Sequence, residues 1–379
     1  MVYKNKVNIL QIGMTKNIGG MESYLMAQYR KMNKEKIHYD FINLTEECPL
    51  AFEDELIENK SKIFSVPTRR KEPLKHYWKM IKTLFRERRN YRYIVLNTCH
   101  LYYIFPLFIA KLFGIPNRII HSHNGGDEIK ISSLRKVLIS INKLLMKFSV
   151  TDYWACSKLA GEWMFGKKRK FKVIHNAIDV DKFKFDKNIR DYMRKQLNIK
   201  DDQFVVGHVG RFSYQKNHLF LIDIFNEIVK IKPNAVLLLI GDAVVDDNYL
   251  IETKQKVKRL GLDSNVKFLG LRKDTNRLYQ AMDCFVLPSR FEGLPVVGIE
   301  AQTAGLSCFF ADTITDELKI TDLVDFIPLD KSLKFWAEKV IKKTNEERID
   351  MSSIIQKAGY DIKYEVSKLE NYYRSNVSE

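Results

Sequence analysis

The sequence lacks the cysteine pattern of a disulfide-stabilised or zinc-binding scaffold. Its five cysteines are odd in number, lie far apart and include no C-x-x-C pair. Disulfide-rich domains and zinc ribbons depend on closely spaced cysteine pairs. We therefore expect free thiols and a reducing, cytoplasmic setting.

Long apolar runs are also missing. The apolar stretch near the N-terminus, residues 7–12, ends at Gly13 and is shorter than the core of a secretory signal. The best candidate for a membrane span, residues 101–115, is interrupted by Pro106, Lys111 and Gly114. A spanning helix needs about 20 apolar residues, so we expect none here.

Acidic residues are scarce in the first half of the chain. The whole sequence has 63 Lys and Arg against 46 Asp and Glu, a net charge of +17, and residues 1–180 contribute 32 against 16. The densest segment, residues 69–92, mixes ten basic residues with apolar ones such as Trp78 and Phe85. This mixture is typical of a basic amphipathic helix, which can lie on an anionic membrane, be an ordinary solvated helix or bind nucleic acid.

No zinc finger, RRM signature or KH loop accompanies the basic segment. We therefore expect an anionic membrane surface as the partner of the basic half and no nucleic acid. The corresponding location is cytoplasmic, peripheral on the inner face of the cell membrane.

What the chain does contain is a regular alternation of strand-like and helix-like segments. Such alternation is typical of βαβ units with a parallel sheet, and 379 residues suit two domains. A polar stretch, 177–200, separates two such series and is expected to be a linker with a short helix. The sequence predicts an α/β protein with two Rossmann-like domains and parallel sheets, 1–178 and 179–359. The strands are expected at 7–13, 41–44, 61–66, 93–98, 118–123, 152–157 and 171–176, then at 204–210, 235–241, 265–270, 283–289 and 306–311.

Ligands of such sheets bind at the carboxyl ends of the strands, which draws attention to the loops there. Gly19 and Gly20 precede a helix and can offer backbone N–H groups to a phosphate, although the same pattern occurs in ordinary strand–helix turns. Arg211 and Lys216 follow the first strand of the second series. Their spacing suits two adjacent phosphates, or they are simply solvated loop charges.

A pair of glutamates marks a third loop. Glu292 is followed by Gly-Leu-Pro-Val-Val-Gly-Ile and then Glu300, so the first lies in a loop and the second in the following helix. Backbone N–H groups from Gly293 to Val297 can face a sugar or a phosphate. The two carboxylates can accept hydrogen bonds from polyol hydroxyls, although a glutamate near a helix start also favours the helix dipole.

Two histidines follow the strand at 118–123. His121 and His123 resemble a metal pair, but no third or fourth ligand is evident, so a substrate contact and a core position are the other readings. The Asp179-Val-Asp181 pattern lies in the expected linker and is short enough to occur by chance. We expect no metal and no cofactor.

Three of these motifs occur in a fixed order: GGME after the first strand, GRFSYQKNH at the start of the second series, and EGLPVVGIE near the end. Together they resemble retaining glycosyltransferases of family 4, over nearly the whole chain. Within that family the sequence is similar to bacterial capsule and exopolysaccharide sugar transferases. The resemblance implies a GT-B fold of two facing Rossmann-like domains, with the C-terminal helix 360–379 crossing back to the first.

The resemblance also implies roles for individual residues. Glu292 and His123 would be catalytic, facing the donor sugar and the reacting centre. The acceptor and phosphate loop would contain Gly19, Gly20 and Glu22. The donor would be bound by Gly210, Arg211, Lys216, Leu271, Gly293, Leu294, Val296 and Glu300, with the base held by the segment 268–272.

The expected activity is retaining, metal-independent transfer of a hexose or N-acetylhexosamine. The donor would be a nucleotide diphosphate sugar, with UDP the favoured nucleotide, and the acceptor a glycan, favoured as lipid-linked, in surface polysaccharide synthesis. Two alternatives remain: a nucleotide-sugar 2-epimerase of the same fold, and a non-catalytic basic protein that binds membrane or RNA.

Overall fold

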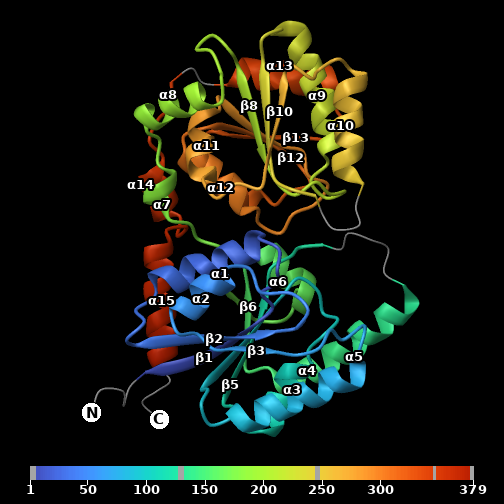
Figure 1. Ribbon diagram of the computed structural model, residues 1–379, viewed down its shortest axis with the longest axis vertical. Coiled ribbons are helices and arrows are strands. Elements are labelled where there is room, and N and C mark those ends of the chain that lie inside the picture. The colour runs from blue at the N-terminus through green and yellow to red at the C-terminus, as the bar shows by residue number, and fades with distance from the viewer. Residues whose placement is uncertain (1–5, 127–131, 244–247, 345–346, 376–379) are drawn as a thin grey trace. The chain divides into compact units, whose positions relative to one another are not determined.

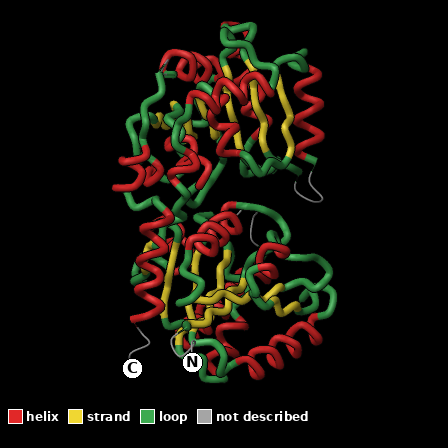
Figure 2. The backbone as a smooth tube through the Cα atoms, turned by 60° about the vertical axis from the view of Figure 1, so that its left-hand side comes forward, coloured by secondary structure: helices red, strands yellow, loops and turns green. Residues whose placement is uncertain are grey.

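The computed structural model describes residues 6–126, 132–243, 248–344 and 347–375. The chain divides into two compact units. The first consists of Met1–Ala177 with Ile362–Glu379, and the second of Ile178–Asp361. Each unit has its own parallel sheet with helices on both faces (Figures 1 and 2).

The first unit is built on a seven-stranded sheet in the order β3-β2-β1-β4-β5-β6-β7. Its strand pairs are all parallel, so the loops after the strands gather at one edge of the sheet. The strands are β1 Val7–Ile12, β2 Ile37–Asn43, β3 Ile63–Ser65, β4 Tyr93–Thr98, β5 Asn117–Ser122, β6 Asp152–Ala155 and β7 Lys172–Val173. The helices are α1 Gly20–Lys31, α2 Glu53–Glu58, α3 Pro73–Glu87, α4 Phe105–Leu112, α5 Ser133–Ser149, α6 Lys158–Phe165 and α15 Ile362–Ser375.

Alternation along β1 shows how this sheet is buried on both faces. Val7 and Ile9 pack in one core with α1 and α15, whereas Leu10 and Ile12 pack in another with α3, α4 and α5. Successive strand side chains point to opposite faces, so one apolar run supplies both cores. The C-terminal helix α15 therefore belongs to the first unit, and its Tyr373 backbone oxygen accepts a hydrogen bond from Tyr93 Oη at 3.2 Å.

The second unit has a six-stranded parallel sheet in the order β10-β9-β8-β11-β12-β13. Leu238 and Ile240 of β9 face one core, and Leu237 and Leu239 face the other. The strands are β8 Val205–Val209, β9 Val236–Ile240, β10 Val266–Gly270, β11 Cys284–Leu287, β12 Ser307–Ala311 and β13 Val324–Ile327. The helices are α7 Val180–Phe183, α8 Lys187–Gln196, α9 His218–Ile231, α10 Tyr249–Arg259, α11 Thr275–Ala281, α12 Val296–Thr303, the 3₁₀ turn η1 Asp316–Leu318, α13 Leu333–Lys343 and α14 Ser352–Lys357.

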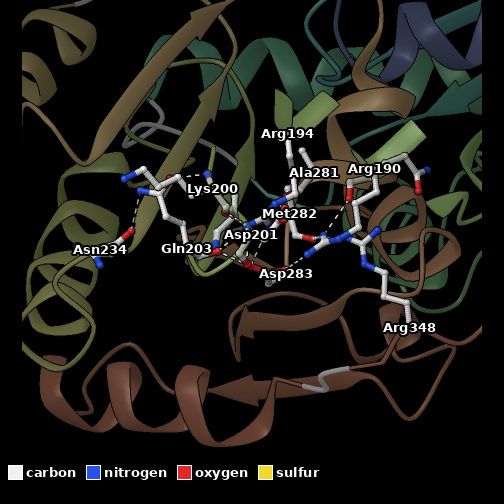
Figure 3. Close-up of polar contacts among 12 residues, drawn as sticks. Arg190, Arg194, Lys200, Asp201, Gln203, Asn234, Ala281, Met282, Asp283 and Arg348 are labelled. Atoms are coloured by element: carbon white, nitrogen blue, oxygen red, sulfur yellow. Dashed lines mark hydrogen bonds and ion pairs between the residues drawn. The ribbon is translucent and has the colours of Figure 1, made fainter. Parts of the chain in front are cut away.

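The segment 177–200, expected to be a linker with a short helix, contains more helix than predicted. Helices α7 and α8 lie there and pack on α11 within the second unit. Arg190 Nη2 contacts Asp283 Oδ1 at 2.6 Å, and Arg194 Nη1 lies 3.5 Å from the other carboxylate oxygen. Both guanidinium groups also donate to backbone oxygens at the end of α11 (Figure 3). The polar composition that suggested a linker is that of a helix held by charge pairing.

The predicted strands coincide with observed ones, but several are shorter than expected, as β3, β6 and β7 show. The prediction missed β13 and the helices α13 and α14 altogether. Within the residues that the structure describes, no helix combines the length and apolar character needed to cross a membrane. The fold class is as predicted: α/β, with two Rossmann-like domains on parallel sheets.

Candidate functional site

Most of the predicted donor residues lie in loops at the carboxyl edge of the second sheet. The loops after β8, β9, β10 and β11 all start at that edge because the strands are parallel. Backbone hydrogen bonds join them: Phe212 N donates to Asp242 O at 3.0 Å, and Gly241 N donates to Gly270 O at 2.9 Å. Gly241 has φ of +144°, and a Cβ there would lie 2.0 Å from Gly210 O. Only glycine allows two of the loops to approach so closely.

Lys216 and Glu292 form the central pair of this edge. Lys216 Nζ lies 2.6 Å from Glu292 Oε1, and the two side chains are only 15% and 8% exposed. Gln215 Nε2 donates to the second oxygen of Glu292 at 3.2 Å and to Phe291 O at 3.1 Å. The loop after β8 is thus tied to the loop after β11, and the two predicted residues meet in one site.

Arg211 and Gly210 border this pair. Arg211 is exposed, and it has no ion-pair partner among the residues the structure describes. A Cβ at Gly210 would lie 3.1 Å from the Lys216 side chain, so the glycine leaves room for the lysine to pass. An exposed guanidinium and a lysine in the same loop can bind the oxygens of a diphosphate.

The loop that follows Glu292 presents backbone donors. The N–H groups of Gly293, Leu294 and Val296 have no hydrogen-bond acceptor among the described parts of the chain. Val296 starts α12, where the first N–H groups have no partner within the helix and the helix dipole favours an anion. These three predicted residues therefore form a row of donors beside the ion pair.

Glu300 lies in the second turn of α12 and is bound by Tyr279. The Tyr279 hydroxyl donates to Glu300 Oε2 at 2.8 Å. Burial raises the pKa of Glu300 to about 7, and the hydrogen bond from Tyr279 only partly opposes this. A carboxylate with this pKa can be ionised when hydroxyl donors approach it and can accept hydrogen bonds from a diol.

Leu271 follows β10 at the same edge of the second sheet. Its side chain is 57% exposed, and Gly270 before it adopts φ of +66°. The Arg272 guanidinium is engaged by Asp274, to whose two carboxylate oxygens it donates hydrogen bonds at 2.7 Å each. The exposed backbone at 270–271 is the part of the predicted base-binding segment that can contact a ligand.

In the first unit, Gly19, Gly20 and Glu22 surround the start of α1. Gly19 is the N-cap residue and Gly20 the first helical residue. Glu22 Oε1 accepts hydrogen bonds from the Thr15 hydroxyl at 2.8 Å and from Thr15 N at 3.2 Å. The buried carboxylate of Glu22 thus closes the loop after β1, while Gly20 remains exposed to a ligand.

His123 lies at the same sheet edge, after β5. Its Nε2 is 3.2 Å from Asn97 Oδ1, and Asn97 Nδ2 donates to Ile12 O at 3.2 Å, so the imidazole carries its hydrogen on Nε2. Burial lowers the pKa of His123 to about 3, outweighing the opposite effect of the Asn176 side chain. The imidazole is therefore neutral at physiological pH, with the lone pair on Nδ1.

His121 occupies the core. It packs edge-on against Tyr24 and Trp154, and burial lowers its pKa well below the usual value. In the described residues, no cluster of three or more His, Cys, Asp and Glu side chains is arranged to hold a metal. Asp179 and Asp181 lie at the start of α7, where Asp179 pairs with Lys182 at 3.8 Å.

The structure brings Lys216, Glu292 and the donor loops together in the second unit, and Gly19, Gly20, Glu22 and His123 along one sheet edge in the first. Sequence reasoning missed Gln215, Tyr279 and Asn97. Asn97 had a usable signal, since a polar residue ends an otherwise apolar strand. Tyr279 had none, because its partner Glu300 is 21 residues away.

Several known proteins are similar to this chain. Residues 189–317 match a family model described as "Glycosyl transferases group 1". The chain is 28% identical over 370 residues to "Putative glycosyltransferase EpsF" of Bacillus subtilis, covering 96% of this chain and 94% of that protein. It is 24% identical over 389 residues to an Escherichia coli UDP-Gal:alpha-D-GlcNAc-diphosphoundecaprenol alpha-1,3-galactosyltransferase, covering 97% of each.

Solved structures share the fold. HepE of Anabaena in complex with UDP-glucose superposes with a TM-score of 0.74 at 21% identity, over 98% of this chain and 99% of that one. Sucrose-phosphate synthase of Thermosynechococcus elongatus gives 0.76 at 15% identity, over 98% and 100%. These neighbours have the GT-B fold of glycosyltransferases. Residues 189–317 of this chain accordingly match the group 1 glycosyltransferase family, within a chain that is similar over nearly its whole length to two proteins named as glycosyltransferases.

Proposed function

We propose that this protein is a retaining glycosyltransferase of surface-polysaccharide synthesis. It transfers a hexose or N-acetylhexosamine from a UDP-sugar to a lipid-linked glycan, without a metal or cofactor. The observation that carries the proposal is the pairing of Lys216 with Glu292 at 2.6 Å, beside the exposed Arg211 and a row of free backbone donors. The UDP-glucose complex of HepE and the UDP-galactose and diphosphoundecaprenol in the name of the E. coli relative support the choice of donor and acceptor.

Donor binding follows from the charges of the second unit. Arg211 and Lys216 take the diphosphate, and the free N–H groups of Gly293, Leu294 and Val296 take sugar or phosphate oxygens. Glu300 accepts the ribose hydroxyls, and the backbone near Leu271 contacts the base. When the donor binds, Lys216 divides its charge between Glu292 and the phosphate.

The chemical step then needs little beyond positioning and charge stabilisation. The bond between sugar C1 and the diphosphate oxygen breaks, and its electron pair goes to the diphosphate. The acceptor hydroxyl oxygen bonds to C1 on the same face, and its proton passes to the departing diphosphate. Lys216 and Arg211 stabilise the charge that develops on the leaving group, and Glu292 stabilises the positive charge at the sugar. His123, whose imidazole is neutral, contacts the sugar near the reacting centre.

The decisive experiment is a donor screen. The purified protein is incubated with UDP- and GDP-sugars and an undecaprenyl-diphosphate-linked sugar, and released nucleotide is measured. We expect UDP release that requires the acceptor, persists in EDTA and yields a product with the anomeric configuration of the donor by NMR. Conversion of the donor without acceptor would identify a 2-epimerase instead, and absence of nucleotide binding would identify a non-catalytic protein.

The first unit supplies a surface suited to an anionic membrane. The exposed residues Leu74, Trp78, Ile81 and Phe85 follow one stripe of α3, and Val137, Ile141, Leu144 and Phe148 follow the same i, i+4, i+7, i+11 spacing on α5. We name these eight residues the amphipathic surface. The end of α4 lies between the two stripes: Phe85 contacts Phe113, the residue after α4, at 5.3 Å between ring centroids, and Lys111 Nζ lies 5.9 Å from the Phe148 ring.

Basic side chains border the amphipathic surface. Lys75 and Lys82 on α3 and Lys136, Lys143 and Lys147 on α5 are exposed. Apolar side chains bordered by lysines are the pattern of a helix that lies in the interface of an anionic bilayer. This arrangement supports a peripheral position on the cytoplasmic face of the cell membrane, where a lipid-linked acceptor is available.

A further inference from the structure

The first unit contains a basic pocket that none of the predicted sites includes. Its volume is about 480 Å³, within the range of ligand pockets. We call it the arginine pocket. It is lined by Arg69, Arg70, His100, Tyr102, Arg135 and Leu138.

Aromatic side chains hold the guanidinium groups in place. Arg69 lies over the Tyr103 ring at 4.6 Å, and its Nη1 is 3.4 Å from Tyr102 O. Arg135 lies 5.7 Å from the Tyr102 ring centroid, and the Tyr102 ring stacks on His100 at 5.1 Å. Stacked guanidinium groups lose less freedom when they bind an anion, so the site is partly preorganised.

No carboxylate from the described part of the chain pairs with the arginines of the arginine pocket. Three acidic side chains on the segments around α3 pair with lysines: Glu46 with Lys79, Glu47 with Lys71 and Glu72 with Lys75. Throughout the described ranges, Arg69, Arg70 and Arg135 make no ion pair with a carboxylate. Arg135 also lies in the first turn of α5, where the helix dipole adds positive potential. Three guanidinium groups around one cavity require a multiply charged anion, and arginine forks bind phosphate oxygens in pairs.

The position of the pocket indicates that the anion has an apolar tail. Leu138 lines the pocket and is exposed, and it lies one turn before Ile141 on α5. Arg69 and Arg70 precede α3, whose stripe begins at Leu74. The pocket therefore opens where the stripes of the amphipathic surface begin.

The arginine pocket is close, in the sheet topology, to the edge of the first sheet that carries His123. His100 follows β4 by two residues, and His123 N donates to Thr98 O, the last residue of β4, at 3.0 Å. A ligand in the arginine pocket thus lies at the same edge of the sheet as His123 and Gly20.

We propose that the arginine pocket binds the diphosphate of the lipid-linked acceptor. The lipid then runs along the amphipathic surface, and the first sugar points toward the sheet edge that carries His123. This inference rests on the proposed function, which supplies the lipid-linked acceptor. The inference adds to that function the side chains that would bind a lipid diphosphate in preference to other anionic lipids of equal total charge.

The test compares the wild type with the triple variant Arg69→Gln, Arg70→Gln, Arg135→Gln. A matched control, Lys167→Gln, Lys168→Gln, Lys170→Gln, removes the same charge from exposed positions of the first unit after α6. Binding is measured by flotation on phosphatidylcholine vesicles that contain either undecaprenyl diphosphate or phosphatidylglycerol at equal negative charge. Inorganic pyrophosphate serves as a competitor, and binding of UDP is followed by thermal shift.

The wild type and the control should prefer undecaprenyl diphosphate by about tenfold or more, as charge-assisted arginine–phosphate bonds would give. The triple variant should lose that preference while its UDP-induced thermal shift is unchanged. Retention of the preference by the triple variant overturns the inference, and so does a wild type that binds pyrophosphate but shows no preference for the lipid. Failure of the proposed function is a separate result, in which the wild type consumes no nucleotide sugar although the binding preference is present.

Discussion

At the scale of single residues, Lys216 and Glu292 are the two side chains of the second unit to which we assign charge stabilisation during sugar transfer. We expect Lys216→Ala to lower the rate of sugar transfer about 100- to 1000-fold, the effect of removing one group that stabilises developing negative charge. Released nucleotide measures the rate. Lys216→Arg keeps the charge and should retain more activity than alanine.

The control for this prediction is Lys230→Ala, at an exposed position on α9 where the lysine pairs with Glu227. Circular dichroism establishes that each variant is folded, because an unpaired buried Glu292 destabilises the loop. Full activity in folded Lys216→Ala would contradict the role given to this lysine.

Glu300 makes donor binding depend on pH. Its pKa of about 7 means that the carboxyl is largely protonated at pH 6 and ionised at pH 8. The ribose hydroxyls donate to the ionised form, so binding requires loss of the proton below pH 7. Affinity for a UDP-sugar, whose diester phosphates do not titrate in this range, should fall about tenfold from pH 8 to pH 6.

Isothermal titration at several pH values measures this dependence. Glu300→Gln should bind more weakly at pH 8 and with little change between pH 6 and pH 8. Tyr279→Phe removes the hydrogen bond that stabilises the ionised form, so it should move the midpoint to higher pH. A midpoint that is identical in wild type and Glu300→Gln would assign the titration to another group.

At the scale of elements, α8 is held to the second sheet by charge. Asp283 accepts from Arg190 at 2.6 Å and from Val205 N at 2.7 Å, and Arg194 lies 3.5 Å away with only 4% of its side chain exposed. Asp283→Asn leaves two arginines without a counter-charge, and we expect the free energy of unfolding of the second unit to fall by about 3 kcal/mol. Asp191→Asn is the control, because its pair with Lys187 on the same helix is exposed and should contribute little. Urea denaturation distinguishes the two, and equal stability of both variants would show that α8 is held by packing alone.

The same elements show what can be predicted from sequence. The apolar runs of β1, β9 and β12 are buried on both faces, so their composition alone marks them as strands of a parallel sheet. A short helix was expected within 177–200, where α8 lies, but its attachment was missed because its partner Asp283 is about 90 residues away and no local pattern reveals the pair.

The candidate site likewise has a part that the sequence predicts and a part that only the structure shows. Lys216 and Glu292 were found because each follows a strand at the carboxyl edge. The interactions that set their neighbours' properties, Tyr279 with Glu300 and Asn97 with His123, depend on tertiary contacts. Glu22 was predicted to lie in the acceptor loop, and its hydrogen bonds with Thr15, which could not be read from the sequence, close that loop.

At the scale of the whole molecule, the net charge of +17 comes almost entirely from residues 1–180, and the exposed apolar stripes of α3 and α5 lie in that same half. Binding to an anionic bilayer should therefore have two separable components. The electrostatic component weakens as salt shortens the screening length from about 10 Å at 0.1 M to about 3 Å at 1 M. The apolar component persists in salt but is lost when the stripes are made polar.

Flotation on vesicles of phosphatidylcholine with phosphatidylglycerol measures both components. Trp78→Ser combined with Phe148→Ser removes two side chains that are 63% and 60% exposed. Burial of each aromatic side chain in the bilayer contributes more than about 1 kcal/mol to binding, so the double variant should bind about tenfold more weakly or worse. Ile231→Ser, at an exposed apolar position on α9 of the second unit, is the matched control and should bind as the wild type does. Salt weakens the electrostatic component of binding and the aromatic substitutions weaken the apolar component. The double variant in high salt should therefore bind least of all. Binding that is indifferent to both would place the membrane contact elsewhere on the chain.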